Sequence, residues 1–135
     1  MTTELRCQSG AIRGHIDKAR SYAFATCYCK DCQAFARFLE RENSVLNGKG
    51  GTEILATLPA SITFDQGEDE LACMSLSPNG MLRWYASCCS TPIGNTPRDR
   101  NMPYVGVVSA CVPEFEARLG KPVVAITAES ATRPV

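Results

Sequence analysis

The sequence has 135 residues, with 14 basic and 14 acidic side chains and an isoelectric point near 6.6. A chain of this length is expected to form a single domain, residues 1–135, that buries about two thirds of its unfolded surface without extra cross-links. The balanced charge lacks the basic footprint of proteins that bind nucleic acid or anionic membranes. The apolar runs are far shorter than the roughly 18 to 20 residues that cross a bilayer. We therefore expect neither a nucleic-acid partner nor a membrane partner.

The eight cysteines are the main compositional feature. The N-terminal segment, Met1 to Arg6, lacks the charged start and apolar centre of a secretory signal peptide, which predicts a cytoplasmic protein. In that reducing compartment, numerous cysteines indicate metal ligands more than a disulfide framework.

The chain begins with a predicted β-hairpin over residues 5–16, because apolar and polar residues alternate after a Ser9-Gly10 turn. Cys7 lies at the bend of this hairpin. The only histidine, His15, falls within the alternation and is predicted to be a solvated strand residue rather than a ligand. Residues 22–26 are expected to form a strand that leads into the next group of cysteines.

Three cysteines lie within six residues in the segment Cys27-Tyr28-Cys29-Lys30-Asp31-Cys32. This spacing indicates a knuckle that directs three sulfurs at one Zn²⁺ ion and leaves the fourth tetrahedral position to water or substrate. Buried or disulfide-bonded thiols are one alternative reading. The start of an iron–sulfur site is another, although such clusters usually need a fourth cysteine.

Residues 33–42 are predicted to form a helix that follows the knuckle. Phe35, Phe38 and Leu39 recur at helical spacing, and both phenylalanines are expected in the core. Residues 43–51 contain two glycine-rich turns and are expected to form a loop, without the pattern of a phosphate-binding loop.

From residue 52 onward the sequence predicts an antiparallel β-meander of short strands separated by turns. The strongest hairpin signal is Pro78-Asn79-Gly80, which predicts that strands 71–76 and 82–85 pair. Cys73 and Cys111 are expected to be small buried apolar residues. The expected elements are strands at 52–57, 61–64, 71–76, 82–85, 105–112 and 123–127, and a helical turn at 115–119.

Aromatic residues precede a turn that carries Cys88 and Cys89. One or both of these cysteines can join Cys7 in a second sulfur cluster, or the adjacent pair can be redox-active. A purely structural turn is the remaining reading, and a strained vicinal disulfide is the rarer outcome.

Three cysteine-bearing segments follow one another along the chain: Cys7-Gln8-Ser9-Gly10-Ala11, Cys27-Tyr28-Cys29-Lys30-Asp31-Cys32-Gln33 and Tyr85-Ala86-Ser87-Cys88-Cys89-Ser90-Thr91-Pro92. Together they resemble the motifs C-x-C-G-A, C-H-C-x-x-C-[RQ] and F-C-x-x-C-G-T-P of the glutathione-dependent formaldehyde-activating enzyme family, also called the centromere-protein-V domain family. The resemblance covers most of the chain and implies a mainly β fold, a zinc-containing β-tent of antiparallel sheets, to which we add one short helix after the cysteine knuckle. In the family the first and third motifs jointly hold a structural zinc, and the second motif holds a zinc near the active site.

The sequence departs from the family pattern at two structural ligands. Ser9 stands at the second cysteine of the first motif, and with Thr91-Pro92 setting the register, Ala86 stands at the first cysteine of the third motif. Cys7 and Cys89 remain as a degenerate second site, which Cys88 can also join. Because structural zinc is normally closed by four protein ligands, we expect this second site to be empty, with a hydrogen bond from Ser9 in its place.

The resemblance implies a carbon–sulfur lyase, similar to an S-hydroxymethylglutathione synthase, that acts on the adduct of glutathione or another small thiol with formaldehyde or another aldehyde. Zinc held by Cys27, Cys29 and Cys32 is expected to take the thiol as its fourth ligand, because binding to zinc deprotonates a thiol. Three thiolates make the metal a poor Lewis acid, so nearby donors such as Lys30 or Tyr28 are needed to assist.

The alternative class is a non-catalytic zinc-knuckle β-domain with a structural or protein-binding role. In that case the metal ties the cysteine loop to the sheet and a fourth protein ligand closes it. The exposed edges of such a β-domain also favour pairing into a homodimer.

Overall fold

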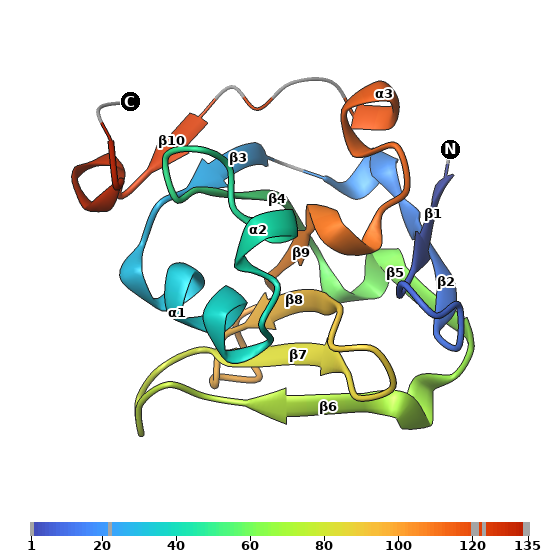
Figure 1. The fold of residues 1–135 in the computed structure, drawn as a ribbon. Coiled ribbons are helices and arrows are strands. Elements are labelled where there is room, and N and C mark those ends of the chain that lie inside the picture. Colours follow the sequence, from blue (N-terminus) through green and yellow to red (C-terminus); the bar gives the residue numbers. More distant parts are fainter. Residues whose placement is uncertain (1, 22, 120–121, 123, 134–135) are drawn as a thin grey trace.

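A computed structural model describes residues 2–21, 23–119, 122 and 124–133, and it is mainly β, as predicted (Figure 1). Among these residues, ten strands form two sheets and three short α-helices flank them. The strands are β1 Thr2–Arg6, β2 Arg13–Asp17, β3 Ala23–Cys27, β4 Thr52–Thr57, β5 Ile62–Gln66, β6 Leu71–Met74, β7 Leu82–Ala86, β8 Pro92–Thr96, β9 Val105–Val108 and β10 Val124–Ile126. The helices are α1 Lys30–Phe38, α2 Glu42–Val45 and α3 Phe115–Leu119.

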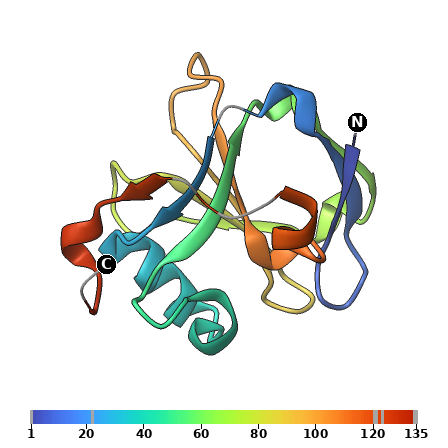
Figure 2. The same ribbon diagram turned by 90° about the horizontal axis from the view of Figure 1, so that it is seen from above.

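The smaller sheet has the strand order β1-β2-β5, and the larger sheet has the order β10-β3-β4-β9-β8-β7-β6. All neighbouring strands are antiparallel except β10, which runs parallel to β3. The smaller sheet lies at one side of the molecule and α1 and α2 lie at the other, with β4, β9 and β8 between them (Figures 1 and 2).

The main hydrophobic core joins side chains of both sheets. Phe24 on β3 packs its ring edge against Phe115 of α3, with the ring centroids 4.7 Å apart. Each large aliphatic side chain that is fully buried in this core stabilises the fold by about 1.5–3 kcal/mol relative to leaving it exposed to water. The fully buried members include Leu5, Ile12, Ile16 and Val107.

The predicted meander from residue 52 is wrong in its first part. Strand β5 leaves the larger sheet and pairs with β2, whereas β4 pairs with β3 and β9. The close approach of β5 depends on Gly14, because a Cβ atom there would lie 2.2 Å from the carbonyl oxygen of Thr63. The later prediction is confirmed, since β6 and β7 pair antiparallel.

The helices differ from the prediction of one short helix at residues 33–42. Helix α1 begins earlier, at Lys30, because the Cys29 sulfur caps it by accepting a hydrogen bond from the backbone N–H of Cys32. Helix α2 lies partly within the predicted loop and is held by Val45, which is buried against α1 and β9. Phe35 is buried as predicted, but the prediction for Phe38 is wrong, since its side chain is 52% exposed and forms a T-shaped pair with the Tyr85 ring.

Three single-residue predictions have different outcomes. Cys111 is fully buried, as predicted. Cys73 is exposed instead of buried, because β6 is the edge strand of the larger sheet. His15 is partly exposed on β2, with its Nδ1 atom 3.1 Å from a carboxylate oxygen of Asp65.

Candidate metal centre

The sulfurs of Cys27, Cys29 and Cys32 converge at the junction of β3 and α1. We call these three residues the first cluster. Strand β3 ends at Cys27, and the turn into α1 brings Cys29 and Cys32 back beside it, with all three sulfurs within 4.8 Å of one another. Cys27 and Cys32 are buried, whereas Cys29 is partly exposed.

The spacing of the first cluster fits a tetrahedral thiolate metal site. Zn–S bonds of about 2.3 Å place the sulfurs of such a site about 3.8 Å apart. The sulfurs of Cys27 and Cys32 are 3.6 Å apart. Among the described residues, no fourth Cys, His, Asp or Glu joins this group. The first cluster can therefore hold a metal ion while leaving one of four positions to another ligand.

Arg83 on β7 supplies a buried positive charge beside the first cluster. Its Nη1 atom donates a hydrogen bond to the Cys32 sulfur at 3.5 Å, and its guanidinium carbon lies 5.8 Å from the centroid of the Phe35 ring. Burial opposes the charge of Arg83, but the Cys32 and Cys29 sulfurs raise its pKa above the usual value. An outer cation of this kind favours the thiolate form of the ligands.

The contacts among the three sulfurs and Arg83 shift the pKa values of Cys29 and Cys32 in opposite directions. Hydrogen bonds from Cys27 and Cys32 lower the pKa of Cys29, and the charge of Arg83 lowers it further. The neighbouring sulfurs of Cys27 and Cys29 raise the pKa of Cys32. The contacts around the first cluster therefore favour the thiolate form of Cys29.

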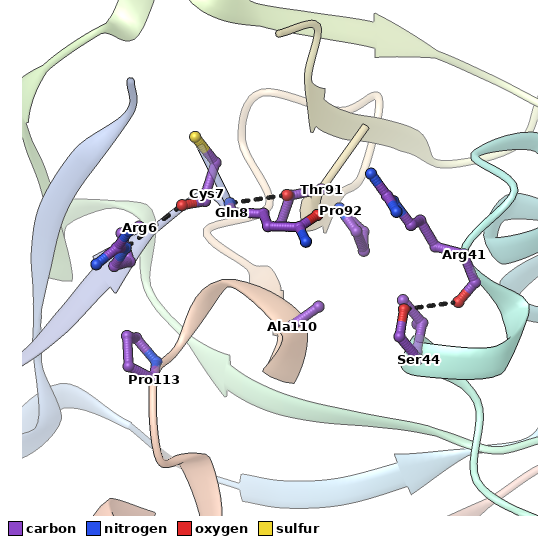
Figure 3. Close-up of a pocket in the computed structure, with 10 residues that line it drawn as sticks. Arg6, Cys7, Gln8, Arg41, Ser44, Thr91, Pro92, Ala110 and Pro113 are labelled. Atoms are coloured by element: carbon purple, nitrogen blue, oxygen red, sulfur yellow. Dashed lines mark hydrogen bonds between the residues drawn. The ribbon is translucent and has the colours of Figure 1, made fainter. Parts of the chain in front are cut away.

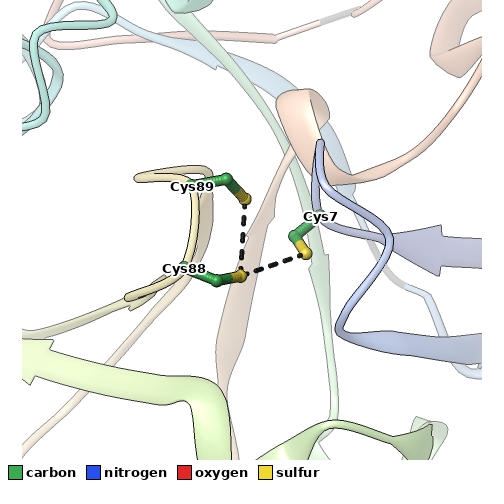
Figure 4. Close-up of side chains that lie close together, drawn as sticks. All are labelled: Cys7, Cys88 and Cys89. Carbon is green, nitrogen blue, oxygen red and sulfur yellow. Dashed lines mark hydrogen bonds between the residues drawn. The ribbon is translucent and has the colours of Figure 1, made fainter.

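A second cluster comprises Cys7, Cys88 and Cys89 (Figure 4). Cys7 follows β1, and the other two lie in the turn between β7 and β8, so the cluster joins the smaller sheet to the larger one. The Cys88 sulfur lies 3.8 Å from that of Cys7 and 3.7 Å from that of Cys89. These distances also match the edge of a tetrahedral zinc–sulfur site of about 3.8 Å.

The second cluster contains the third sulfur that the sequence left open. The register of the third motif retained only Cys7 and Cys89, and the structure adds Cys88, since the tight turn places both adjacent cysteines on the cluster side. Ser9 lies beside the cluster, with its Oγ atom 3.4 Å from the Cys7 sulfur and 3.2 Å from the Cys88 sulfur. Partial burial opposes ionisation of Cys89, but hydrogen bonds from Thr91 and Ser9 lower its pKa to about 6.

Replacing Ser9 by cysteine is expected to add one tightly bound zinc ion per chain. The Ser9 side chain already points at the sulfurs of Cys7 and Cys88, so a thiol there closes the second cluster with a fourth ligand. In the unsubstituted protein we expect the second cluster to bind zinc more weakly than the first. Zinc retained per chain against chelators of graded affinity measures both effects.

The matched control for this experiment is Ser77→Cys, which adds a thiol to an exposed turn between β6 and β7. It should leave the zinc content unchanged. The prediction fails if Ser9→Cys retains no more zinc than the unsubstituted chain.

The cysteine spacing predicted the first cluster, and the sequence left open whether Cys88 joins the second, but no sequence pattern indicated Arg83. Arg83 is 51 residues from Cys32 along the chain, and no local pattern signals their contact. Of the two side chains that we expected as donors to a substrate, Lys30 is exposed and Tyr28 is buried.

None of the described helices is long and apolar enough to pass through a bilayer.

The fold and its two sulfur clusters define a mainly β protein that can hold metal ions. The chain belongs to a family described as "Family of unknown function (DUF6151)", whose model matches residues 1–129. Its fold is similar to that of a Rhodobacter sphaeroides protein, a structural genomics target, with a TM-score of 0.58 and 13% sequence identity. That similarity covers 90% of this chain and 98% of the other, and it shows a shared fold alone. No curated protein matches the chain.

Proposed function

We propose that this chain is a zinc protein that binds a small thiol, such as glutathione, at the first cluster and acts as a carbon–sulfur lyase on its aldehyde adduct. The observation that carries the proposal is the three-sulfur group of Cys27, Cys29 and Cys32, which no fourth described ligand completes. Zinc in such a group lowers the pKa of a coordinated thiol and so supplies a nucleophilic sulfur at neutral pH.

The residues around the first cluster support a role in holding negative charge. Three thiolates exceed the charge of one divalent ion, and Arg83 offsets the excess from the buried side of Cys32. The partly exposed Cys29 marks the side from which a further ligand approaches. In the proposed reaction the thiol sulfur bonds to the aldehyde carbon, and the carbonyl oxygen gains the proton that the thiol lost. No redox partner is needed.

A backbone feature supports the resemblance to the formaldehyde-activating family. In the register set by Thr91-Pro92, Ser90 occupies the position of the glycine in the third motif. Ser90 has a φ angle of +57°, in the left-handed region that glycine adopts without steric cost. A left-handed residue at this position is consistent with the register that aligns Ser90 with the family glycine.

The second candidate is a non-catalytic zinc-knuckle domain, and the size of the space beside Cys32 favours it. The cavity there measures about 10 Å³ and is also lined by Thr52, Arg83 and Asn95. A space of this size is suited to one water molecule rather than to a substrate. In this candidate the metal fastens the turn between β3 and α1 to the sheet.

The two candidates are separated by titrating glutathione into the protein loaded with Co²⁺, a spectroscopic substitute for zinc. The lyase predicts one metal per first cluster, a change in the cobalt–thiolate absorption on addition of glutathione, and exchange between formaldehyde and its glutathione adduct by NMR. Cys73→Ser is the matched control, because Cys73 is exposed and belongs to neither cluster.

The lyase proposal fails if metal is present but millimolar glutathione changes neither the cobalt spectrum nor the thermal stability. A metal site with those properties is the outcome that the non-catalytic candidate predicts.

A further inference from the structure

A pocket of about 430 Å³ lies beside the second cluster, between the β1–β2 hairpin and α2 (Figure 3). Its volume falls within the usual range of small-molecule sites, about 300–1,000 Å³. Arg6 and Arg41 line it from opposite sides, together with polar groups of Gln8, Ser44 and Thr91. No Asp or Glu is among the residues that line it. The pocket is therefore cationic although the whole chain has no net charge.

Both arginines are oriented by backbone carbonyls of the second cluster. Arg41 donates from Nη2 to the carbonyl oxygen of Cys89 at 2.7 Å, and Arg6 donates from Nε to that of Cys7 at 3.4 Å. Neither guanidinium forms an ion pair with any described residue. Each keeps further N–H donors for a ligand, because a guanidinium has five.

The backbone around Arg41 is itself held in place. The Ser44 hydroxyl donates to the carbonyl oxygen of Arg41 at 3.2 Å, and the backbone N–H of Gln8 donates to the Thr91 hydroxyl at 3.0 Å (Figure 3). Two guanidinium groups on fixed backbone are pre-organised, which reduces the entropy lost when a ligand binds.

We infer that this pocket binds a small organic dianion with an acidic group at each end, of which a dicarboxylate is the simplest example. A guanidinium binds a carboxylate with two parallel hydrogen bonds, so two opposed arginines select a ligand with two separated acidic groups. The inference does not depend on the first cluster, whose three cysteines are absent from the pocket lining.

The inference is tested by calorimetric titration of the full chain with succinate, glutarate and adipate, and with butyrate and inorganic phosphate as comparisons. At least one dicarboxylate should bind saturably, and more tightly than either comparison ligand. Arg6→Gln and Arg41→Gln should each weaken its binding about 10- to 100-fold, as expected for loss of a hydrogen bond between charged groups. Arg98→Gln is the matched control, because Arg98 also donates to backbone carbonyls but lies in a different turn.

A second readout uses the unsubstituted protein and so does not depend on whether the variants fold. The bound dicarboxylate should shift the amide NMR signals of Gln8, Ser44 and Ala110, all of which line the pocket. The inference is overturned if no dicarboxylate binds saturably, if phosphate alone binds, or if Arg98→Gln weakens binding as much as Arg41→Gln.

Discussion

Replacing Cys32 by serine is expected to remove the metal from the first cluster and to lower the thermal stability of the protein. Cys32 is 6% exposed, and its sulfur lies 3.6 Å from the Cys27 sulfur and accepts a hydrogen bond from Arg83. A serine hydroxyl is shorter and stays protonated near neutral pH, so it does not replace the thiolate. A ligand present at about 1,000 times its dissociation constant contributes about 4 kcal/mol to the free energy of unfolding. The variant should lose metal-dependent stability of this order.

Metal content by elemental analysis and the free energy of unfolding by denaturant titration measure this loss. Cys73→Ser provides the comparison, since an exposed substitution outside both clusters should change stability by less than about 0.5 kcal/mol. Treating the unsubstituted protein with a strong chelator should reproduce most of the effect of Cys32→Ser. A Cys32→Ser variant with full metal content and unchanged stability would contradict the assignment of the first cluster.

Replacing Arg83 by methionine is expected to weaken metal binding at the first cluster about 10- to 100-fold, the usual effect of losing an outer-shell partner. Arg83 is 4% exposed, and its charge favours ionisation of the cluster sulfurs. Without it, the pKa of Cys29 rises, because the positive charge that lowers this pKa is lost. The pH at which half of the sites hold metal should therefore move upward.

Stability should also fall by about 3–5 kcal/mol, as when one partner of a buried charge pair is removed. Arg83→Lys keeps the charge and should recover part of the metal affinity, but not the planar contact of the guanidinium with Phe35. Arg98→Met tests whether losing any arginine has the same effect. An unchanged pH midpoint in Arg83→Met would show that Arg83 acts through packing alone.

The first cluster could be predicted because its geometry is local. Cys27, Cys29 and Cys32 lie in one six-residue segment, and a strand followed directly by a helix turns their side chains toward one point. The pairing of β6 with β7 was predictable for the same reason, since turn residues at Pro78-Asn79-Gly80 separate two short strands. The connection is nevertheless a longer loop, residues 75–81, in which the Gly80 N–H donates to the Ser77 carbonyl oxygen and neither Asn79 nor Gly80 has a positive φ.

The second cluster and the cationic pocket could not be predicted in full, because their parts are distant in sequence. Cys7 and Cys88 are 81 residues apart, and only the meeting of the two sheets brings their sulfurs to 3.8 Å. Motif register indicated Cys89 but passed over Cys88, since a motif records spacing and not the direction of a turn. Arg6 and Arg41 carried no sequence signal, although the structure places them on opposite sides of one pocket.

Local residue patterns were enough to specify the mainly β character, the turn positions and the segment in which three sulfurs meet. These features follow from residue spacing over fewer than about ten positions, where backbone geometry limits the outcome. The folded arrangement of the whole chain was needed to show that β5 crosses to the smaller sheet, that Arg83 contacts Cys32, and that Cys88 joins Cys7 and Cys89. These contacts depend on which strands pair, and strand pairing is decided by burial across the whole core rather than by any one segment.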